Sequence, residues 1–210
     1  MADAERFISV VATGDASVAP DLAVVSFAVT GSGKELTPTR DDVNKRSSKV
    51  LASLRELGVA EGDLNAPDVC IHPEYDYRKG QQLTGYRVVR QMTAKVRDLD
   101  RLGDVLDWLV SAGANEVQGA QMSASDPSAA EHEALRAAIT AARAKAEALA
   151  DAGGVSLGGL DRIEEEAGGA VPMPRMQMMA AGAMAEGAPT EVAAGDLTVT
   201  RQVRAWFAIE

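Results

Sequence analysis

The stretch from Asp126 to Gly154 constrains the fold most, because it predicts one long helix over residues 127–152. Asp126 can cap the start of this helix, and Pro127 suits the first helical position because the N–H that it lacks would have no partner there. Gly153 and Gly154 can end the helix, since glycine adopts the left-handed backbone conformation at low cost. At about 1.5 Å per residue the helix is roughly 39 Å long, which is enough to cross a whole sheet.

The apolar residues of this helix repeat at spacings of three and four and predict one buried face. That face comprises Leu135, Ala138, Ile139, Ala142, Ala146, Leu149 and Ala150. A second stripe on the opposite side is made of alanine alone, namely Ala137, Ala141, Ala144 and Ala148. Alanine is the best helix former, which explains such a stripe without any function. Small side chains at this spacing also allow a neighbour to approach closely, and we predict self-association through this alanine stripe.

Patterns elsewhere in the chain predict strands. The apolar, β-branched runs at residues 7–13 and 22–30 flank a turn-like segment that starts at Gly14, and they predict an antiparallel hairpin. Residues 68–77 and 83–97 predict a second strand pair. In residues 83–97 apolar and polar side chains alternate, which is expected of a strand with one buried and one solvent-facing side.

Two shorter helices and three more strands complete the predicted fold. One helix opens at Thr37 and ends at Gly58, and the other is capped by Asp98 and ends at Gly113. The three strands are predicted at residues 115–124, 156–166 and 197–209. The predicted fold class is α+β, a mainly antiparallel sheet with helices packed on it, in the order ββαββαβαββ. We expect a single domain over residues 1–210.

Residues 167–195 differ from the rest of the chain, because they are rich in Gly, Ala, Pro and Met and show no periodicity. We predict a long flexible loop there. Five of the eight methionines fall in this loop, and thioethers are soft ligands that suit Cu(I). Met176, Met178 and Met179 are therefore candidates for a soft-metal or small-ligand site. An apolar loop that packs on a neighbour explains the same composition without a metal, and it is the interpretation we favour.

Residues that could support catalysis are few. Cys70 is the only cysteine, and His72 lies two positions after it on a predicted strand, so a thiolate–imidazole pair is one interpretation. No third orienting group is evident, so the interpretation that we favour is a small packed side chain beside a polar one. Gly31 to Lys34 resembles the start of a phosphate-binding loop but lacks its remainder. We therefore predict a protein that is not an enzyme and that uses no cofactor.

The charge balance and the start of the chain limit partners and location. There are 21 basic and 31 acidic residues, and the net charge of −10 argues against nucleic acid and anionic membrane surfaces as partners. No apolar run is long enough to span a bilayer. The first six residues include no basic region followed by an apolar one, so we predict a cytoplasmic location.

Several segments together resemble the SIMPL domain family, whose members include periplasmic immunogenic proteins and proteins linked to oxidative-stress defence. The resemblance extends over nearly the whole chain. It is carried by Ile8–Val10 with Gly14, Val18–Ala23, Leu54–Val59, the pair Tyr75 and Tyr77 with Gly85 and Tyr86, and Ala134–Ala150 with Gly153 and Gly154. The chain departs from the family in lacking the usual export signal.

The resemblance implies a non-enzymatic domain that builds higher oligomers, in some cases ring-like or channel-like. It carries over no catalytic residues, since none is established for the family. We therefore expect a homo-oligomeric interaction module with a role linked to stress tolerance. The alternative is a soft-metal or small-ligand binding protein that uses the Met-rich loop, and an enzyme built on Cys70 and His72 is the least favoured interpretation.

Overall fold

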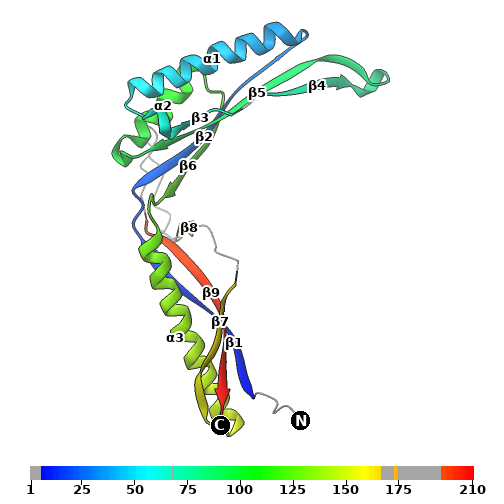
Figure 1. Cartoon of the computed structure of the whole chain (residues 1–210). Helices are drawn as coiled ribbons and strands as arrows, with labels where there is room; N and C mark the ends of the chain where they lie inside the picture. The colour runs from blue at the N-terminus through cyan, green and yellow to red at the C-terminus, as the bar shows by residue number, and fades with distance from the viewer. Residues whose placement is uncertain (1–5, 68, 167–172, 175–194) are drawn as a thin grey trace, which may run out of the picture. The chain divides into compact units, whose positions relative to one another are not determined.

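The computed structural model describes residues 6–67, 69–166, 173–174 and 195–210 (Figure 1). Both helices and antiparallel sheets are present, which confirms the predicted α+β class. In chain order the strands and α-helices are β1(Phe7–Val18), β2(Leu22–Gly33), α1(Leu36–Glu56), β3(Leu64–Asn65), β4(Cys70–Asp76), β5(Gln82–Val96), α2(Leu102–Ala112), β6(Glu116–Ser123), α3(Ser128–Gly153), β7(Leu157–Glu165), β8(Met173–Pro174) and β9(Leu197–Ile209). The predicted order is confirmed, with β3 and β8 as two additional short strands.

The described residues form two compact units. The first contains β1, α3 and the strands from β7 to β9, and the second contains the elements from β2 to β6. The single domain over residues 1–210 stays a prediction, which the coincidence of the unfolding transitions of the two units would test.

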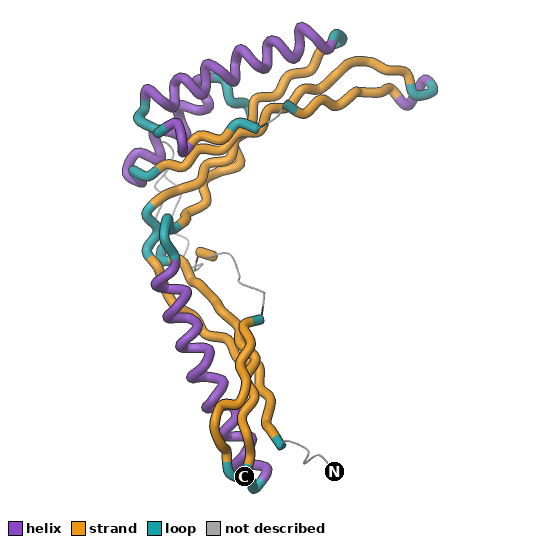
Figure 2. The backbone as a smooth tube through the Cα atoms, in the orientation of Figure 1, coloured by secondary structure: helices purple, strands orange, loops and turns teal. Residues whose placement is uncertain are grey.

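The first unit is an antiparallel sheet in the order β1-β9-β7, with β8 pairing with β9 (Figure 2). Helix α3 packs on β1 and β9 and barely touches β7. Strand β9 confirms the strand predicted at residues 197–209, and the side chains that it buries alternate along it: Leu197, Val199, Val203, Ala205 and Phe207. Helix α3 begins at Ser128, one residue later than predicted, so Pro127 is the N-cap residue and not the first helical one; Asp126 Oδ1 accepts a hydrogen bond of 3.0 Å from Ser128 N. The predicted C-terminal end is present, since Gly154 is left-handed at φ 68°.

The buried face of α3 differs from the prediction, because Ile139 and Leu149 are 38% and 48% exposed. The residues that α3 does bury are all alanine and four positions apart: Ala130, Ala134, Ala138, Ala142, Ala146 and Ala150. Four residues turn the helix by about 400°, so this row drifts about 40° around the helix at each step. The prediction assumed a straight stripe and therefore misplaced the bulky side chains that flank the row.

The predicted hairpin of residues 7–13 and 22–30 is wrong. Strand β1 pairs with β9 in the first unit, and β2 pairs with β5 and β6 in the second. Gly14 lies within β1, opposite Arg201, and not in a turn. A Cβ at this position would lie 2.2 Å from Ala138 N and 2.3 Å from Ala134 O, so the glycine lets the backbone of α3 approach the strand.

The second unit is a five-stranded antiparallel sheet in the order β3-β5-β2-β6, with β4 also paired to β5. The pairing of β4 with β5 confirms the second predicted strand pair. Helices α1 and α2 pack on this sheet (Figure 1). The largest side chains buried in the core between them are Phe27, Leu54, Met92, Leu102 and Leu109. The helices end as predicted at Gly58 and Gly113, both of which have positive φ angles.

Candidate functional site

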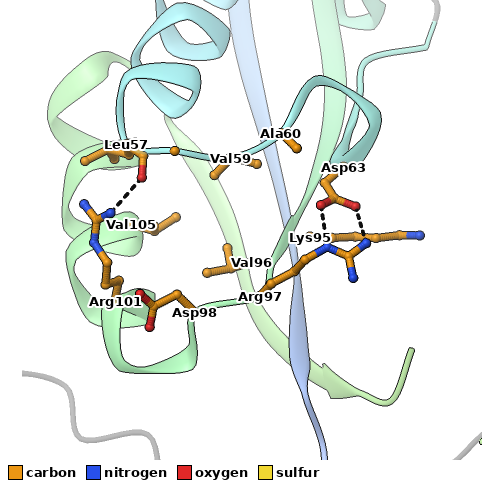
Figure 3. A pocket seen from close by; sticks show the side chains of 11 residues that line it. Leu57, Val59, Ala60, Asp63, Lys95, Val96, Arg97, Asp98, Arg101 and Val105 are labelled. Carbon is orange, nitrogen blue, oxygen red and sulfur yellow. Dashed lines mark hydrogen bonds and ion pairs between the residues drawn. The ribbon is translucent and has the colours of Figure 1, made fainter. Parts of the chain in front are cut away.

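A pocket of about 280 Å³ lies in the second unit, where the end of α1, the end of β5 and the start of α2 meet (Figure 3). Its floor is apolar. Val96 is the last residue of β5 and Val105 belongs to the buried face of α2, while Val59 follows the left-handed Gly58 that ends α1. The pocket is lined by residues 57–60, Asp63, residues 95–98, Arg101 and Val105.

One side of the pocket is closed by a bidentate ion pair between Arg97 and Asp63. Arg97 Nε lies 2.7 Å from Asp63 Oδ2, and Arg97 Nη2 lies 2.8 Å from Asp63 Oδ1. These hydrogen bonds hold the pKa of Asp63 below its ordinary value, and the charges of Arg97 and Lys95 lower it further. The same hydrogen bonds raise the pKa of Arg97. Both groups are therefore charged at neutral pH and satisfy each other.

The other side of the pocket is formed by Arg101 and Asp98 (Figure 3). Arg101 Nη1 donates a hydrogen bond of 2.9 Å to the carbonyl oxygen of Leu57, which ties the segment before α2 to the end of α1. Asp98 precedes the short 3-10 helix Leu99–Arg101, but its side chain makes no capping hydrogen bond, so the predicted cap is wrong. Instead, the carboxylate lines the pocket.

A second candidate surface is the part of β4 and β5 farthest from this pocket along β5. We call residues 70–85 the hairpin arm; its strands are joined through the short 3-10 helix Tyr77–Lys79. Four large apolar side chains of the arm are exposed, namely Ile71 at 41%, Tyr75 at 39%, Tyr77 at 75% and Leu83 at 46%. The rings of Tyr75 and Tyr77 lie 6.4 Å apart.

The residues singled out from the sequence do not converge on one site. Cys70 and His72 are both exposed on β4, and no hydrogen bond joins them. In the part of the chain that the structure describes, no group of three or more His, Cys, Asp or Glu side chains is placed to hold a metal ion. Met176, Met178 and Met179 lie outside the described residues.

The alanine stripe of α3 is not uniform. Ala141, Ala144 and Ala148 are exposed, whereas Ala137 is half-buried. Its carbonyl carbon would lie 2.7 Å from a Cβ at Gly14, so this end of the stripe lies against β1. The row of buried alanines turns gradually around α3, whereas the alanine stripe runs straight along it. The stripe therefore starts beside the sheet at Ala137 and faces solvent at its other end.

Sequence reasoning missed the pocket because its lining comes from three separate segments. Arg97 and Arg101, four positions apart just after an alternating strand, are the local feature that marks it. Nothing in the sequence indicates that Arg97 turns to Asp63 while Arg101 turns to a backbone carbonyl.

None of the helices in the described residues combines the length and hydropathy needed to cross a bilayer.

Comparisons with known proteins identify relatives that match nearly the whole chain. A family named SIMPL, described as "Protein of unknown function (DUF541)", matches residues 8–207. The "Uncharacterized protein YggE" of Edwardsiella ictaluri is 34% identical over 176 residues, which cover 82% of this chain and 74% of that protein. The "26 kDa periplasmic immunogenic protein" of Brucella melitensis is 32% identical over 211 residues, which cover 97% of this chain and 84% of that protein.

The name of the Brucella protein contradicts the cytoplasmic location predicted from the sequence. That prediction rested on the absence of a recognisable export signal in the first residues. A similarity that covers nearly the whole chain outweighs such an absence, and the prediction is wrong.

Proposed function

We propose that this chain, which belongs to the SIMPL family, is a non-enzymatic module that associates with further copies of itself outside the cytoplasm. The relatives named as periplasmic support the location. A role linked to stress tolerance, suggested by the family resemblance, is part of the same proposal. Fractionation of cells that express the natural gene tests the location, and recovery of the protein in the cytoplasmic fraction alone would contradict it.

The exposed apolar side chains of the hairpin arm carry the proposal of self-association. Strand β2 pairs with β5 only as far as Gly33 and Tyr86, so no third strand joins residues 82–85 among the described residues. A two-stranded hairpin alone in water is marginally stable. An arm of this kind that also exposes Tyr75 and Leu83 gains stability when a partner covers it.

The pairing of the arm places these side chains on one side. Ile71 lies opposite Val88, and Tyr75 lies opposite Leu83 after a bulge at Glu74 and Tyr75. Paired residues of antiparallel strands share a face, and Val88 is fully buried in the core. The apolar side of the arm is therefore the continuation of the core face of the sheet.

The face of the arm, and not its edge, is suited to contact a second copy. Pro73 lies in β4 and has no N–H, which weakens pairing of this edge with another strand. A stable interface buries about 800 Å² per partner, and four partly exposed side chains supply about half of that area. The arm therefore needs a second contact, and the exposed residues Ala141, Ala144 and Ala148 are the candidates that we propose for it.

Size-exclusion chromatography with light scattering tests the proposal. Tyr75→Thr with Leu83→Thr removes apolar area from the arm and keeps residues that favour strands. We expect the wild type to be oligomeric and this variant to stay folded by circular dichroism with a smaller mass. Trp108→Gln with Val110→Gln removes two exposed apolar side chains from α2 and should leave the mass unchanged.

The second contact has its own variant. Ala141→Glu with Ala148→Glu places charge on the alanine stripe and keeps a good helix propensity. A smaller mass would support the stripe as a contact, and an unchanged mass would remove it from the proposal. A wild type that is monomeric at micromolar and higher concentration would overturn self-association altogether.

The proposal that the chain is not an enzyme can be tested at Cys70. A catalytic thiolate has a pKa well below that of an ordinary thiol and reacts with alkylating agents at pH 6. We expect Cys70 to be alkylated slowly at pH 6, at a rate that His72→Ala leaves unchanged. Rapid alkylation at pH 6 that is lost in His72→Ala would favour the Cys–His alternative.

A further inference from the structure

Two oppositely charged side chains lie on the same side of the pocket in the second unit and make no ion pair within the described part of the chain. On the other side Arg97 is paired with Asp63, and the ammonium group of Lys95, which makes no ion pair either, points away from the pocket (Figure 3). Asp98 and Arg101 remain. They line one pocket three positions apart, yet no ion pair joins them and Asp98 has no hydrogen-bonding side-chain partner there.

The remaining lining of the pocket is apolar and small. Val59, Ala60, Val96 and Val105 supply the hydrophobic contact surface. Pockets for drug-sized ligands have volumes of about 300–1,000 Å³. A pocket of about 280 Å³ that is open to solvent therefore suits a smaller molecule with a short apolar chain.

We propose that this pocket binds a free α-amino acid with an apolar side chain, such as leucine. Its ammonium group lies at Asp98, its carboxylate at Arg101, and its side chain on Val59, Val96 and Val105. A zwitterion matches the acid and the base that lie together on this side of the pocket, whereas a simple carboxylate leaves Asp98 without a partner and a simple amine makes no use of the free N–H donors of Arg101.

The guanidinium of Arg101 can hold a ligand and keep its structural bond. Only Nη1 is used, in the hydrogen bond to the Leu57 carbonyl oxygen. A guanidinium has five N–H donors in a planar fork, so others remain for a carboxylate. The Arg97–Asp63 pair closes the opposite side, which directs the ligand's charged groups to Asp98 and Arg101 (Figure 3).

Isothermal titration calorimetry of the full chain tests this inference. The probes are L-leucine, 4-methylpentanoate, which lacks the ammonium group, and 3-methylbutylamine, which lacks the carboxylate. Leucine should bind more tightly than either analogue. Asp98→Asn and Arg101→Gln should each weaken leucine binding about tenfold or more, because each removes one charge-assisted hydrogen bond.

The controls separate this site from general effects of charge or folding. Asp100→Asn changes an exposed acid in the same 3-10 helix that does not line the pocket, and it should leave the affinity unchanged. Ala60→Trp places a bulky side chain in the lining of the pocket and should abolish binding even if Arg101→Gln fails to fold. The oligomeric mass is not needed in this test, so its outcome is independent of self-association.

Three results would overturn the inference. One is the absence of heat with leucine at millimolar concentration. Another is equal binding of 4-methylpentanoate together with no effect of Asp98→Asn, which would show a carboxylate site. The third is leucine binding that Ala60→Trp leaves undiminished, which would place the ligand elsewhere.

Discussion

Gly14→Ala should destabilise the first unit, because it forces a methyl group against the backbone of α3. A Cβ at position 14 would lie 2.2 Å from Ala138 N and 2.3 Å from Ala134 O. Ordinary contacts begin at 3.4 Å, so the strand and the helix must separate by roughly 1.2 Å, the difference between 3.4 and 2.2 Å. Backbone atoms cannot rotate out of the way as a side chain can.

The loss of stability can be estimated from the effect of moving α3 away from β1. Moving α3 loosens its buried row of alanines, and overpacking of a core costs about 1–3 kcal/mol, with the upper end appropriate where backbone is struck. Replacement of glycine also lowers the conformational entropy of the unfolded chain, which offsets about 0.4–1 kcal/mol of this loss of stability. The net loss is about 2 kcal/mol. At about 2–4 °C per kcal/mol for a chain of this size, the Tm should fall by about 4–8 °C.

Thermal unfolding followed by circular dichroism measures this change. The control is Gly159→Ala in β7, where a Cβ would meet nothing within 4 Å, and its Tm should stay within about 1 °C of the wild type. Adding Ala138→Gly to Gly14→Ala should not restore the Tm, since the contacts are with main-chain atoms. A Gly14→Ala variant that melts like the control would refute the close packing of α3 on β1.

Three further predictions concern other contacts. The side chain of Arg201 is 17% exposed and forms ion pairs with Glu131 of α3 and, at 3.8 Å, with Glu165 of β7. Arg201→Met should therefore lower the free energy of unfolding in urea by about 1–3 kcal/mol. The control Arg40→Met removes an exposed ion pair with Asp41 and should lower it by less than about 0.5 kcal/mol. The pKa of Asp63 is lowered below its ordinary value of 3.8, so the stability that Asp63 contributes is complete above that pH and is lost as the pH falls through the lowered pKa; the Tm difference between wild type and Asp63→Asn should close over that range and remain constant at higher pH. Trp108 belongs to the second unit and Trp206 to the first, so single-tryptophan variants report each unit by fluorescence; coincident transitions would support one domain, and two separate midpoints would contradict it.

Local features of this fold could be predicted from the sequence because they depend on neighbouring residues. The end of α3 at Gly154 follows from the backbone preference of glycine. The buried side of β9 follows from the alternation of side chains along a strand. Both need no knowledge of the partner element.

Pairings between distant segments could not be predicted in the same way. Val18 pairs with Leu197, and the sequence near β1 instead favoured a turn at Gly14. A glycine that lets a helix backbone approach and a glycine that starts a turn look the same in a sequence. In both cases the position excludes a Cβ, and the sequence does not say which of the two reasons applies. The pocket has the same difficulty, since Asp63, Arg97 and Arg101 acquire their roles only from the bonds they make.

The two candidate surfaces of the second unit can be tested separately because β5 holds them far apart. Leu83 marks the hairpin arm and Val96 the floor of the pocket, thirteen residues along one strand. At about 3.3 Å per residue their separation approaches 43 Å if the strand is straight. Tyr75→Thr with Leu83→Thr should therefore change the oligomeric mass and leave leucine binding at the pocket unaffected. Asp98→Asn should change the affinity for leucine and leave the contact made by the arm unaffected. If either variant alters both readouts, the strand itself has been disturbed, and neither result can be assigned to its surface.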